Sequence, residues 1–338
     1  MIYSFLFRFL LTLLLFVWQR GYAQQGSPLP PAQEKKEATI RFDDTSVPHW
    51  PSDFQRVDIA SSVDGSIQPA YFFTAKGTEP RPLVVSLHTW SGSFEQKDDI
   101  SLICRDKNIH YIHPDFRGPN RTPSACCSDL AMKDIDDAIS FAIANVPVGI
   151  SEIYVIGVSG GGYATLSTFM KSSHPIKKFS AWASISDLTA WHRESQIRKN
   201  RYEQDILACT GSIEHLDSAK AQSRSPLFWP TPVTKLDQAT LTIYAGVYDG
   251  IQGSVPFTHT INFYNKVVKD LGITDPSSYI SMEEKLDLME KTRPLGDFGS
   301  ISGRSVFLSK QVGNLRIVLF EGNHEMLTHF ALDELLDL

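Results

Sequence analysis

The sequence contains only four cysteines in 338 residues, too few for a fold held together mainly by disulfides. It also lacks a basic excess, because 38 Asp and Glu residues outnumber 32 Lys and Arg residues and leave a formal net charge of −6. That balance argues against a nucleic-acid-binding protein. No internal repeat is present. With 42% hydrophobic residues, the chain is long enough to bury the core of one large domain, or of two small ones at most.

Long apolar runs are absent except at the N-terminus, where FLFRFLLTLLLFVW is followed by GYA, ending at Ala23. This pattern predicts a cleaved secretory signal peptide at residues 1–23. The run is short for a membrane span, and an uncleaved N-terminal anchor is the alternative. Residues 24–50, which begin with the polar QQGSPLPPAQEKKE, are predicted to be a tether. We therefore expect a secreted or periplasmic protein that is not inserted in the membrane once the signal is removed.

The four cysteines acquire a meaning from that expectation, since export leads to an oxidising compartment. We expect one disulfide between Cys209 and either Cys126 or Cys127, and the sequence leaves the pairing open. Cys104 is expected to be a free, buried thiol.

Residues 51–338 alternate between short apolar runs and helical patterns. The runs PLVVSLH, IHYIHPDF, EIYVIGV, FSAWASI, TLTIYAG and LRIVLFEG are typical of strands buried on both faces. Further strand patterns flank DGS and VGN and predict an opening and a closing hairpin. The alternation predicts an α/β fold with a mostly parallel sheet and helices on both faces. Residues 187–236 are expected to form a helical cap insert and residues 274–304 a second insert.

One short motif carries the chemistry. Residues 157–161 read GVSGG and fit G-x-S-x-G, with a strand pattern before Ser159 and a helical pattern after it. In such a nucleophile elbow, the serine occupies a strained turn and small neighbours allow the strand and the helix to approach closely. The alternative is a plain glycine-rich bend, but the flanking patterns favour the elbow. We predict that Ser159 is a nucleophile and that Gly161 and Gly162 permit the close approach.

A serine nucleophile needs a histidine base and a carboxylate, in the chain order Ser, acid, His for this type of fold. His324 follows the run LRIVLF directly, in the type of loop from which a base extends, and is preferred over His259 and His329. Asp249 follows TLTIYAG and is the predicted acid. Its alternative role is a simple Asp-Gly turn, and Asp187 and Glu321 are the fallback acids.

A metal site is not expected. HEMLTH at residues 324–329 resembles a zinc-binding helix, but its histidines are five residues apart, about 140° around a helix. We predict no metal and no cofactor.

An attacked acyl group develops an oxyanion, which two backbone N–H groups should stabilise. We assign one to Gly160, the residue after the nucleophile, and the other to Trp90 in SLHTWSGSF, with Thr89 as the neighbouring candidate. The Trp90 indole is expected to line the pocket, unless it is simply a core tryptophan.

At these residues the chain resembles the α/β-hydrolase superfamily, over nearly all of residues 55–338, and within it the prolyl-oligopeptidase-like branch. The segments PLVVSLHTWSG, YIHPDFRGPN, GVSGGG, YDGIQGSVP and FEGNHE carry the resemblance. It implies a Ser159-Asp249-His324 triad. The chain departs from the family at Thr89-Trp90, where many relatives carry a diglycine. It is similar to secreted bacterial pectin or acetyl esterases as well as to exported proteins described as peptidases.

The substrate class is inferred from fewer residues. Fewer than about 35 residues separate the predicted signal peptide from the first strands, which disfavours the gating propeller of true oligopeptidases. Aromatic residues can stack on sugars and guanidinium groups can bind carboxylates. The predicted substrate-binding residues are Trp90, Arg117, Trp191, Arg198 and Arg201.

These residues favour a secreted serine esterase acting on a polysaccharide or oligosaccharide ester, either a pectin methyl ester or an acetyl ester. The charged stretch can instead be a solvated helix, and Arg117 can be structural, paired with Asp115 or Asp187. The alternative functions are a small-peptide hydrolase and a non-catalytic carbohydrate-binding protein. The sequence leaves the oligomeric state open.

Overall fold

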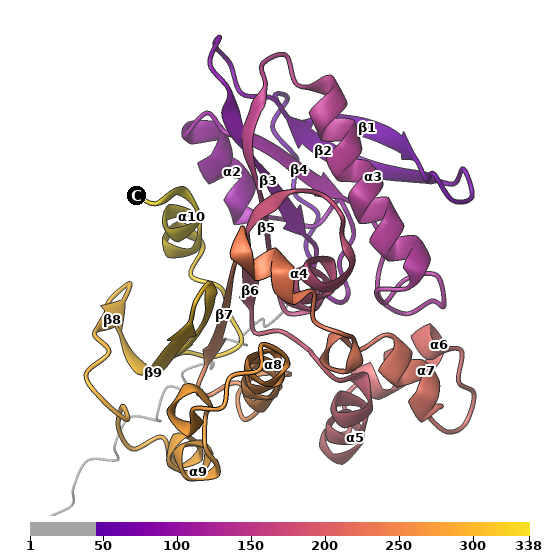
Figure 1. Cartoon of the computed structure of the whole chain (residues 1–338). Coiled ribbons are helices and arrows are strands. Elements are labelled where there is room, and N and C mark those ends of the chain that lie inside the picture. Colours follow the sequence, from indigo (N-terminus) through magenta and orange to yellow (C-terminus); the bar gives the residue numbers. More distant parts are fainter. Residues whose placement is uncertain (1–44) are drawn as a thin grey trace, which may run out of the picture. The chain divides into compact units, whose positions relative to one another are not determined.

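The computed structural model describes residues 45–338, so the predicted signal peptide and most of the predicted tether lie outside the described residues. The central feature is a ten-stranded sheet with the order β1-β2-β4-β3-β5-β6-β7-β10-β9-β8 (Figure 1). Its strands are β1 (Gln55–Ala60), β2 (Ile67–Phe73), β3 (Arg81–Leu87), β4 (His110–Pro114), β5 (Ile150–Val158), β6 (Ile176–Trp182), β7 (Thr240–Gly246), β8 (Ser300–Ile301), β9 (Arg304–Val312) and β10 (Leu315–Phe320).

The six strands from β4 to β10 in this order are mutually parallel. Antiparallel pairs flank them, β1 with β2 on one side and β9 with β10 on the other. The structure therefore confirms the predicted α/β fold, together with the opening and closing hairpins.

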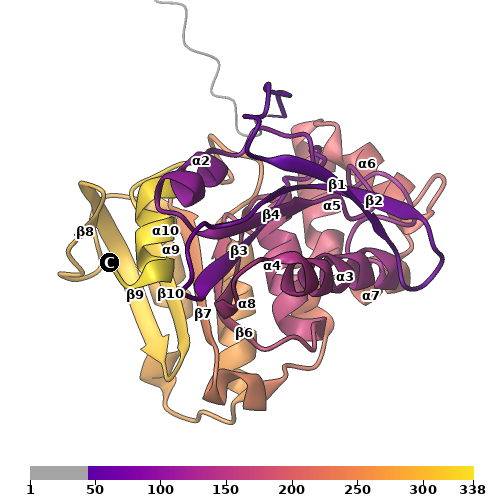
Figure 2. The same ribbon diagram turned by 90° about the horizontal axis from the view of Figure 1, so that it is seen from above.

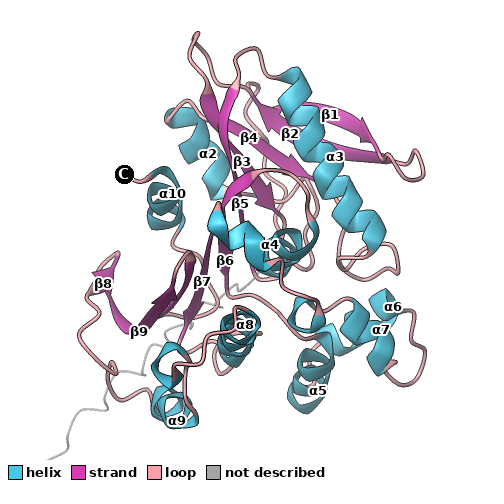
Figure 3. Cartoon of the chain, viewed as in Figure 1, coloured by secondary structure: helices cyan, strands magenta, loops and turns pink. Residues whose placement is uncertain are grey.

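Helices cover both faces of the sheet (Figures 2 and 3). They are α2 (Asp99–Asp106), α3 (Asp129–Asn145), α4 (Gly160–Lys171), α5 (Leu188–Arg198), α6 (Tyr202–Thr210), α7 (Ser218–Ser223), α8 (Thr258–Asp270), α9 (Met282–Glu290) and α10 (Thr328–Leu336), with 3₁₀ helices η1 (Pro226–Phe228), η2 (Val233–Asp237) and η3 (Pro276–Ser278). None of the helices within residues 45–338 is long and apolar enough to span a bilayer.

Two hydrophobic layers follow from the two-residue alternation of the strands. In β3, Leu83 and Val85 belong to the core shared with α3, α4 and α8, whereas Val84 belongs to the core shared with α2 and α10. Both faces of the central strands are thus buried, which explains why they read as continuous apolar runs rather than alternating ones.

The segment from α5 to η2 connects β6 to β7 and corresponds to the first predicted insert. Figure 1 shows α5, α6 and α7 grouped together. Helix α5 begins after Asp187, whose carboxylate accepts the N–H groups of Thr189 and Ala190 as an N-cap. A disulfide between Cys126 and Cys209 joins α6 to the loop before α3, which decides the pairing left open above. Cys104 and Cys127 are free and buried.

Candidate functional site

Ser159 lies at the apex of a sharp turn between β5 and α4. Its φ of 59° and ψ of −120° fall outside the ordinary regions for a side chain other than glycine. The N–H of Ser159 donates to the carbonyl of Trp182 on β6, at 2.9 Å, and holds the turn against the neighbouring strand. A strained backbone that persists in this way is typical of a functional position. The observed turn has the geometry predicted for the elbow.

The turn requires glycine at position 160, because a Cβ atom there would lie 2.1 Å from the backbone nitrogen of Trp90. The loop after β3 therefore approaches the start of α4 more closely than any side chain would permit. Among residues 45–338, no backbone carbonyl accepts a hydrogen bond from the Trp90 N–H. Two backbones meeting beside the serine fit the requirement for an oxyanion hole, and the assignment of Gly160 and Trp90 as donors stays a prediction.

Asp249 and His324 form a buried pair. Asp249 follows β7, His324 follows β10, and these strands are adjacent and parallel, so their C-terminal ends lie together. The Nδ1 of His324 is 2.7 Å from Oδ2 of Asp249, and both side chains are fully buried. The other carboxylate oxygen accepts the N–H groups of Gly250, at 2.8 Å, and Val255, at 3.1 Å. These bonds leave the carboxylate fixed and the imidazole oriented, as the predicted acid and base require.

The loop after Asp249 wraps around this pair, and no role was predicted from the sequence for its residues Gly253 and Ser254. A Cβ atom at Gly253 would lie 2.2 Å from Oδ1 of Asp249 and 2.6 Å from Cβ of His324, so only glycine fits there. The next residue, Ser254, places its Oγ 3.4 Å from Nε2 of His324. Its only sequence signal is its place a few residues after the predicted acid.

The fallback residues lie elsewhere. His259, on α8, contacts Glu194 of α5 through Nε2 at 3.1 Å, and Asp187 caps α5. His329 belongs to α10, whereas His324 precedes that helix. Within the described part of the chain, no group of three His, Cys, Asp or Glu residues is arranged to hold a metal ion.

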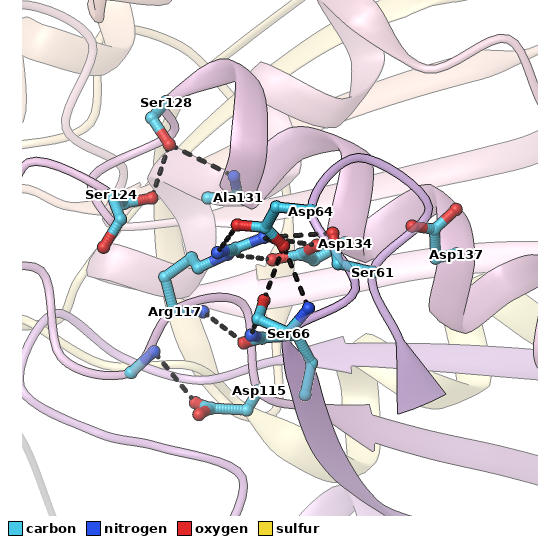
Figure 4. A network of polar contacts seen from close by, with 12 residues as sticks. Ser61, Asp64, Ser66, Asp115, Arg117, Ser124, Ser128, Ala131, Asp134 and Asp137 are labelled. Atoms are coloured by element: carbon cyan, nitrogen blue, oxygen red, sulfur yellow. Dashed lines mark hydrogen bonds and ion pairs between the residues drawn. The ribbon is translucent and has the colours of Figure 1, made fainter. Parts of the chain in front are cut away.

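Arg117 is not placed to bind a substrate. Its side chain is 8% exposed and forms ion pairs with Asp64 and Asp134, and it also donates to Ser61 (Figure 4). Asp134, on α3, is fully buried at its side chain. A buried carboxylate needs such a partner. The substrate-binding prediction for Arg117 is therefore wrong, and its structural role involves Asp64 and Asp134 rather than the partners named from the sequence.

The aromatic residues predicted to face a sugar are also enclosed. Trp90 is 1% exposed and Trp191 is 0% exposed, and their rings pack edge to face with centroids 4.7 Å apart. Neither indole can stack on a sugar ring in this conformation, which corrects both predictions. Arg198 donates to the carbonyl of Gly253 at 2.8 Å, and Arg201 donates to Ser91 Oγ. Both guanidinium groups thus contact loops of the site.

His88, the first residue of the loop after β3, is buried and lies close to Asp115. Burial lowers the pKa of His88 from 6.5 to about 3, so this histidine is neutral at physiological pH. Burial raises the pKa of Asp115, whose Oδ1 is 3.6 Å from His88 Nε2, to about 6. His88 also stacks on Phe116 at 3.8 Å. The loop that carries Trp90 therefore begins with a buried, neutral histidine.

No family model and no curated protein matches the sequence. Solved structures do match the fold. One is an acylaminoacyl peptidase in complex with Z-Gly-Gly-Phe-chloromethyl ketone, with 20% identity and a TM-score of 0.52 over 65% of this chain and 35% of that one. Another is Pyrococcus horikoshii acylaminoacyl peptidase, with 18% identity and the same score and coverage. A third is prolyl oligopeptidase B from Galerina marginata, with 15% identity and a TM-score of 0.51 over 65% of this chain and 32% of that one.

The described chain spans about a third of the length of these structures. At such identities the likeness extends to the fold and not to the activity. The parallel sheet, the helices on both faces and these structural neighbours together establish that the chain has the α/β-hydrolase fold.

Proposed function

We propose that this protein is a serine hydrolase with Ser159 as nucleophile, His324 as base and Asp249 as the orienting acid. The observation that carries this proposal is the fully buried His324–Asp249 hydrogen bond of 2.7 Å. It lies at the same edge of the parallel sheet as the strained Ser159 turn, because β5, β7 and β10 all end there. An acid, a base and a serine in this order and at this edge support nucleophilic catalysis.

The proposed reaction proceeds in two half-reactions. Ser159 Oγ attacks the acyl carbon while His324 Nε2 takes the hydroxyl proton, and Asp249 stabilises the imidazolium that forms. The N–H groups of Gly160 and Trp90 stabilise the oxyanion of the tetrahedral intermediate. When that intermediate collapses, the bond to the leaving group breaks and the leaving group takes the proton from Nε2. Water then attacks the acyl-enzyme by the same route and releases the acid.

For the substrate, we propose a short peptide or an acylated peptide. The structural neighbours named above are peptidases, one of them in complex with a peptide chloromethyl ketone. A polysaccharide ester is less well supported, because the residues from which it was inferred are engaged in contacts within the protein. The side chains of Trp191 and Arg117 are engaged inside the protein, and Arg198 is bonded to a backbone carbonyl. Ester hydrolysis on pectin or acetylated xylan is the second candidate, and it becomes a separate arm of the test.

We also propose that the protein acts outside the cytoplasm. The support is the Cys126–Cys209 pairing, since structural disulfides persist in oxidising compartments. Localisation of the full chain by cell fractionation tests this point.

The decisive experiment treats the full chain with a fluorophosphonate probe and maps the labelled peptide. We expect the label on Ser159, and we expect Ser159→Ala to lose labelling and hydrolysis while its melting temperature stays close to that of the wild type. Ser254→Ala is the matched control, because this second serine also contacts His324. Labelling of Ser254 instead, or activity retained by Ser159→Ala, would overturn the assignment of the nucleophile.

The substrate class is settled in parallel. Peptide and acyl-peptide nitroanilides are compared with methyl-esterified pectin and acetylated xylan, with release of nitroaniline, methanol and acetate as the readouts. We expect nitroaniline release to dominate. Release of methanol or acetate without amide cleavage would favour the esterase. Absence of labelling in the wild-type protein would favour the non-catalytic protein.

A further inference from the structure

Helix α5 holds the segment that surrounds the acid–base pair. The indole N–H of Trp191 donates to the carbonyl of Ser254 at 2.9 Å, and Arg198 Nη1 donates to the carbonyl of Gly253 at 2.8 Å. These are consecutive residues, and both lie directly against His324. Two side chains from one helix therefore fix two successive peptide groups beside the catalytic base.

Helices α5 and α6 also contact the loop after β3, which carries Trp90. The indole N–H of Trp90 donates to Asp205 Oδ2 on α6 at 3.3 Å, and Arg201 donates to Ser91 Oγ in the same loop. Arg201 Nε also lies 3.8 Å from Asp205 Oδ2. The Trp90 ring packs on the Trp191 ring. Trp191 therefore contacts both the loop after β3 and the segment 253–254.

We propose that α5 and α6 form a positioning element for catalysis, in which Trp191 couples the loop carrying Trp90 to the segment 253–254 beside His324. The inference rests on the proposed function, and it adds positioning residues that do not touch the substrate: Trp191, Arg198, Arg201 and Asp205.

The physical reason is geometric. The oxyanion donor and the proton acceptor must be held within a fraction of an ångström for the reaction, and both lie on loops. Loops move more readily than the sheet that carries them. Trp191 is fully buried and makes both a directional hydrogen bond and a ring contact, so it restricts both loops at once.

The main test is Trp191→Phe, which keeps an aromatic ring and removes the indole N–H. We expect kcat to fall about tenfold, with KM changed by less than about twofold, because the bond that is lost positions the base and not the substrate. The matched control is Trp229→Phe. Trp229 lies in the same insert, and its indole N–H donates to the carbonyl of Ser223 at 3.0 Å, so the same bond type is removed elsewhere.

Arg198→Met is the second variant, and it keeps the proposal testable if Trp191→Phe does not fold. We expect kcat to fall several-fold and Arg198→Lys to recover part of the loss. Arg193→Met is its control, since Arg193 lies exposed on the same helix and its side chain forms no hydrogen bond or ion pair with the rest of residues 45–338.

A double-mutant cycle separates positioning from general stability. If Trp191 and Arg198 both act through the segment 253–254 beside His324, then Trp191→Phe should add little to the loss in kcat already caused by Arg198→Met. Additive losses, or equal losses in Trp191→Phe and Trp229→Phe, would overturn the proposal. Fluorophosphonate labelling of the wild-type protein distinguishes the failure of this proposal from the failure of the proposed function. If the wild type is labelled and all positioning variants retain full kcat, only the positioning role is contradicted.

Discussion

The residues proposed for catalysis lie at the C-terminal ends of β5, β7 and β10, where the backbone places them, whereas α5 and α6 contact the same site through side chains. Ser159 is held by its strained turn, and Gly160 is required because another backbone lies where a Cβ would be. Trp191 and Arg198 lie far along the sequence from the segment 253–254 and contact it through single hydrogen bonds to carbonyl groups. A side chain at Gly160 would clash with the neighbouring backbone, whereas substitutions at Trp191 or Arg198 would remove one hydrogen bond at a time.

The largest expected effect breaks the backbone side of this comparison. Gly160→Ala would place a methyl group 2.1 Å from the Trp90 nitrogen, so the loop after β3 must move away. We expect kcat to fall about 10²- to 10³-fold, as for loss of one oxyanion donor, and stability to fall by about 1–3 kcal/mol. Steady-state kinetics and urea unfolding measure the two effects.

Gly149→Ala is the control for that variant, because a Cβ at Gly149 meets only Pro80, at 3.7 Å. We expect its kcat to match the wild type. A Gly160→Ala protein with unchanged kcat would show that the close approach to Trp90 has no catalytic importance.

The next prediction, of intermediate size, concerns the insert between β6 and β7. The disulfide ties α6 to the loop before α3 and closes a separation of 83 residues, so replacing both Cys126 and Cys209 with Ala should lower stability by about 2–4 kcal/mol. The strand ends do not contain this bridge, and we therefore expect the fluorophosphonate labelling rate to fall much less than in Gly160→Ala. Thermal unfolding and labelling kinetics provide the comparison.

Cys127→Ala is the matched control, since Cys127 is the neighbouring buried cysteine outside the bridge. Its loss of stability should be smaller than that of the double variant. A larger loss would mean that packing, rather than the cross-link, carries the contribution.

The smallest effect at neutral pH concerns His88 in the loop that carries Trp90, because its contribution to stability changes only as the pH falls. The pKa of His88 is lowered from 6.5 to about 3 in the folded protein, so the unfolded chain binds a proton first as the pH falls. Stability from this group is complete above about pH 6.5 and is lost toward pH 3, with a slope of up to about 1.4 kcal/mol per pH unit. His88→Gln should flatten the decline measured by urea unfolding between pH 7 and 4.

Asp115 gives a change of the opposite sign. Its folded-state pKa is raised from 3.8 to about 6, so the folded protein binds the extra proton and stability falls as pH rises through that window. Asp115→Asn should remove this fall. Identical pH profiles for His88→Gln, Asp115→Asn and the wild type would show that neither group titrates differently on folding.

Much of the fold and the Asp249–His324 pair followed from local patterns. Strands buried on both faces leave continuous apolar runs, and the run before Ser159 with glycines after it specified the elbow. The order of Ser159, Asp249 and His324 relative to the strands was enough to predict the buried pair. What local patterns missed was Ser254, because a serine beside a glycine in a loop carries no signal of its own until the loop folds back on His324.

The sequence by itself determined the sheet, the nucleophile turn and the acid–base pair, because these depend on periodicity and on the position of a residue at a strand end. Only the tertiary structure decided which groups the charged and aromatic side chains contact and whether they are buried. Arg117, in the loop after β4, forms an ion pair with the buried carboxylate of Asp134 on α3, and Trp191 is enclosed between two loops distant in sequence. The free energy of a charge or an indole depends on which groups surround it, and those groups come from parts of the chain that only the fold brings together.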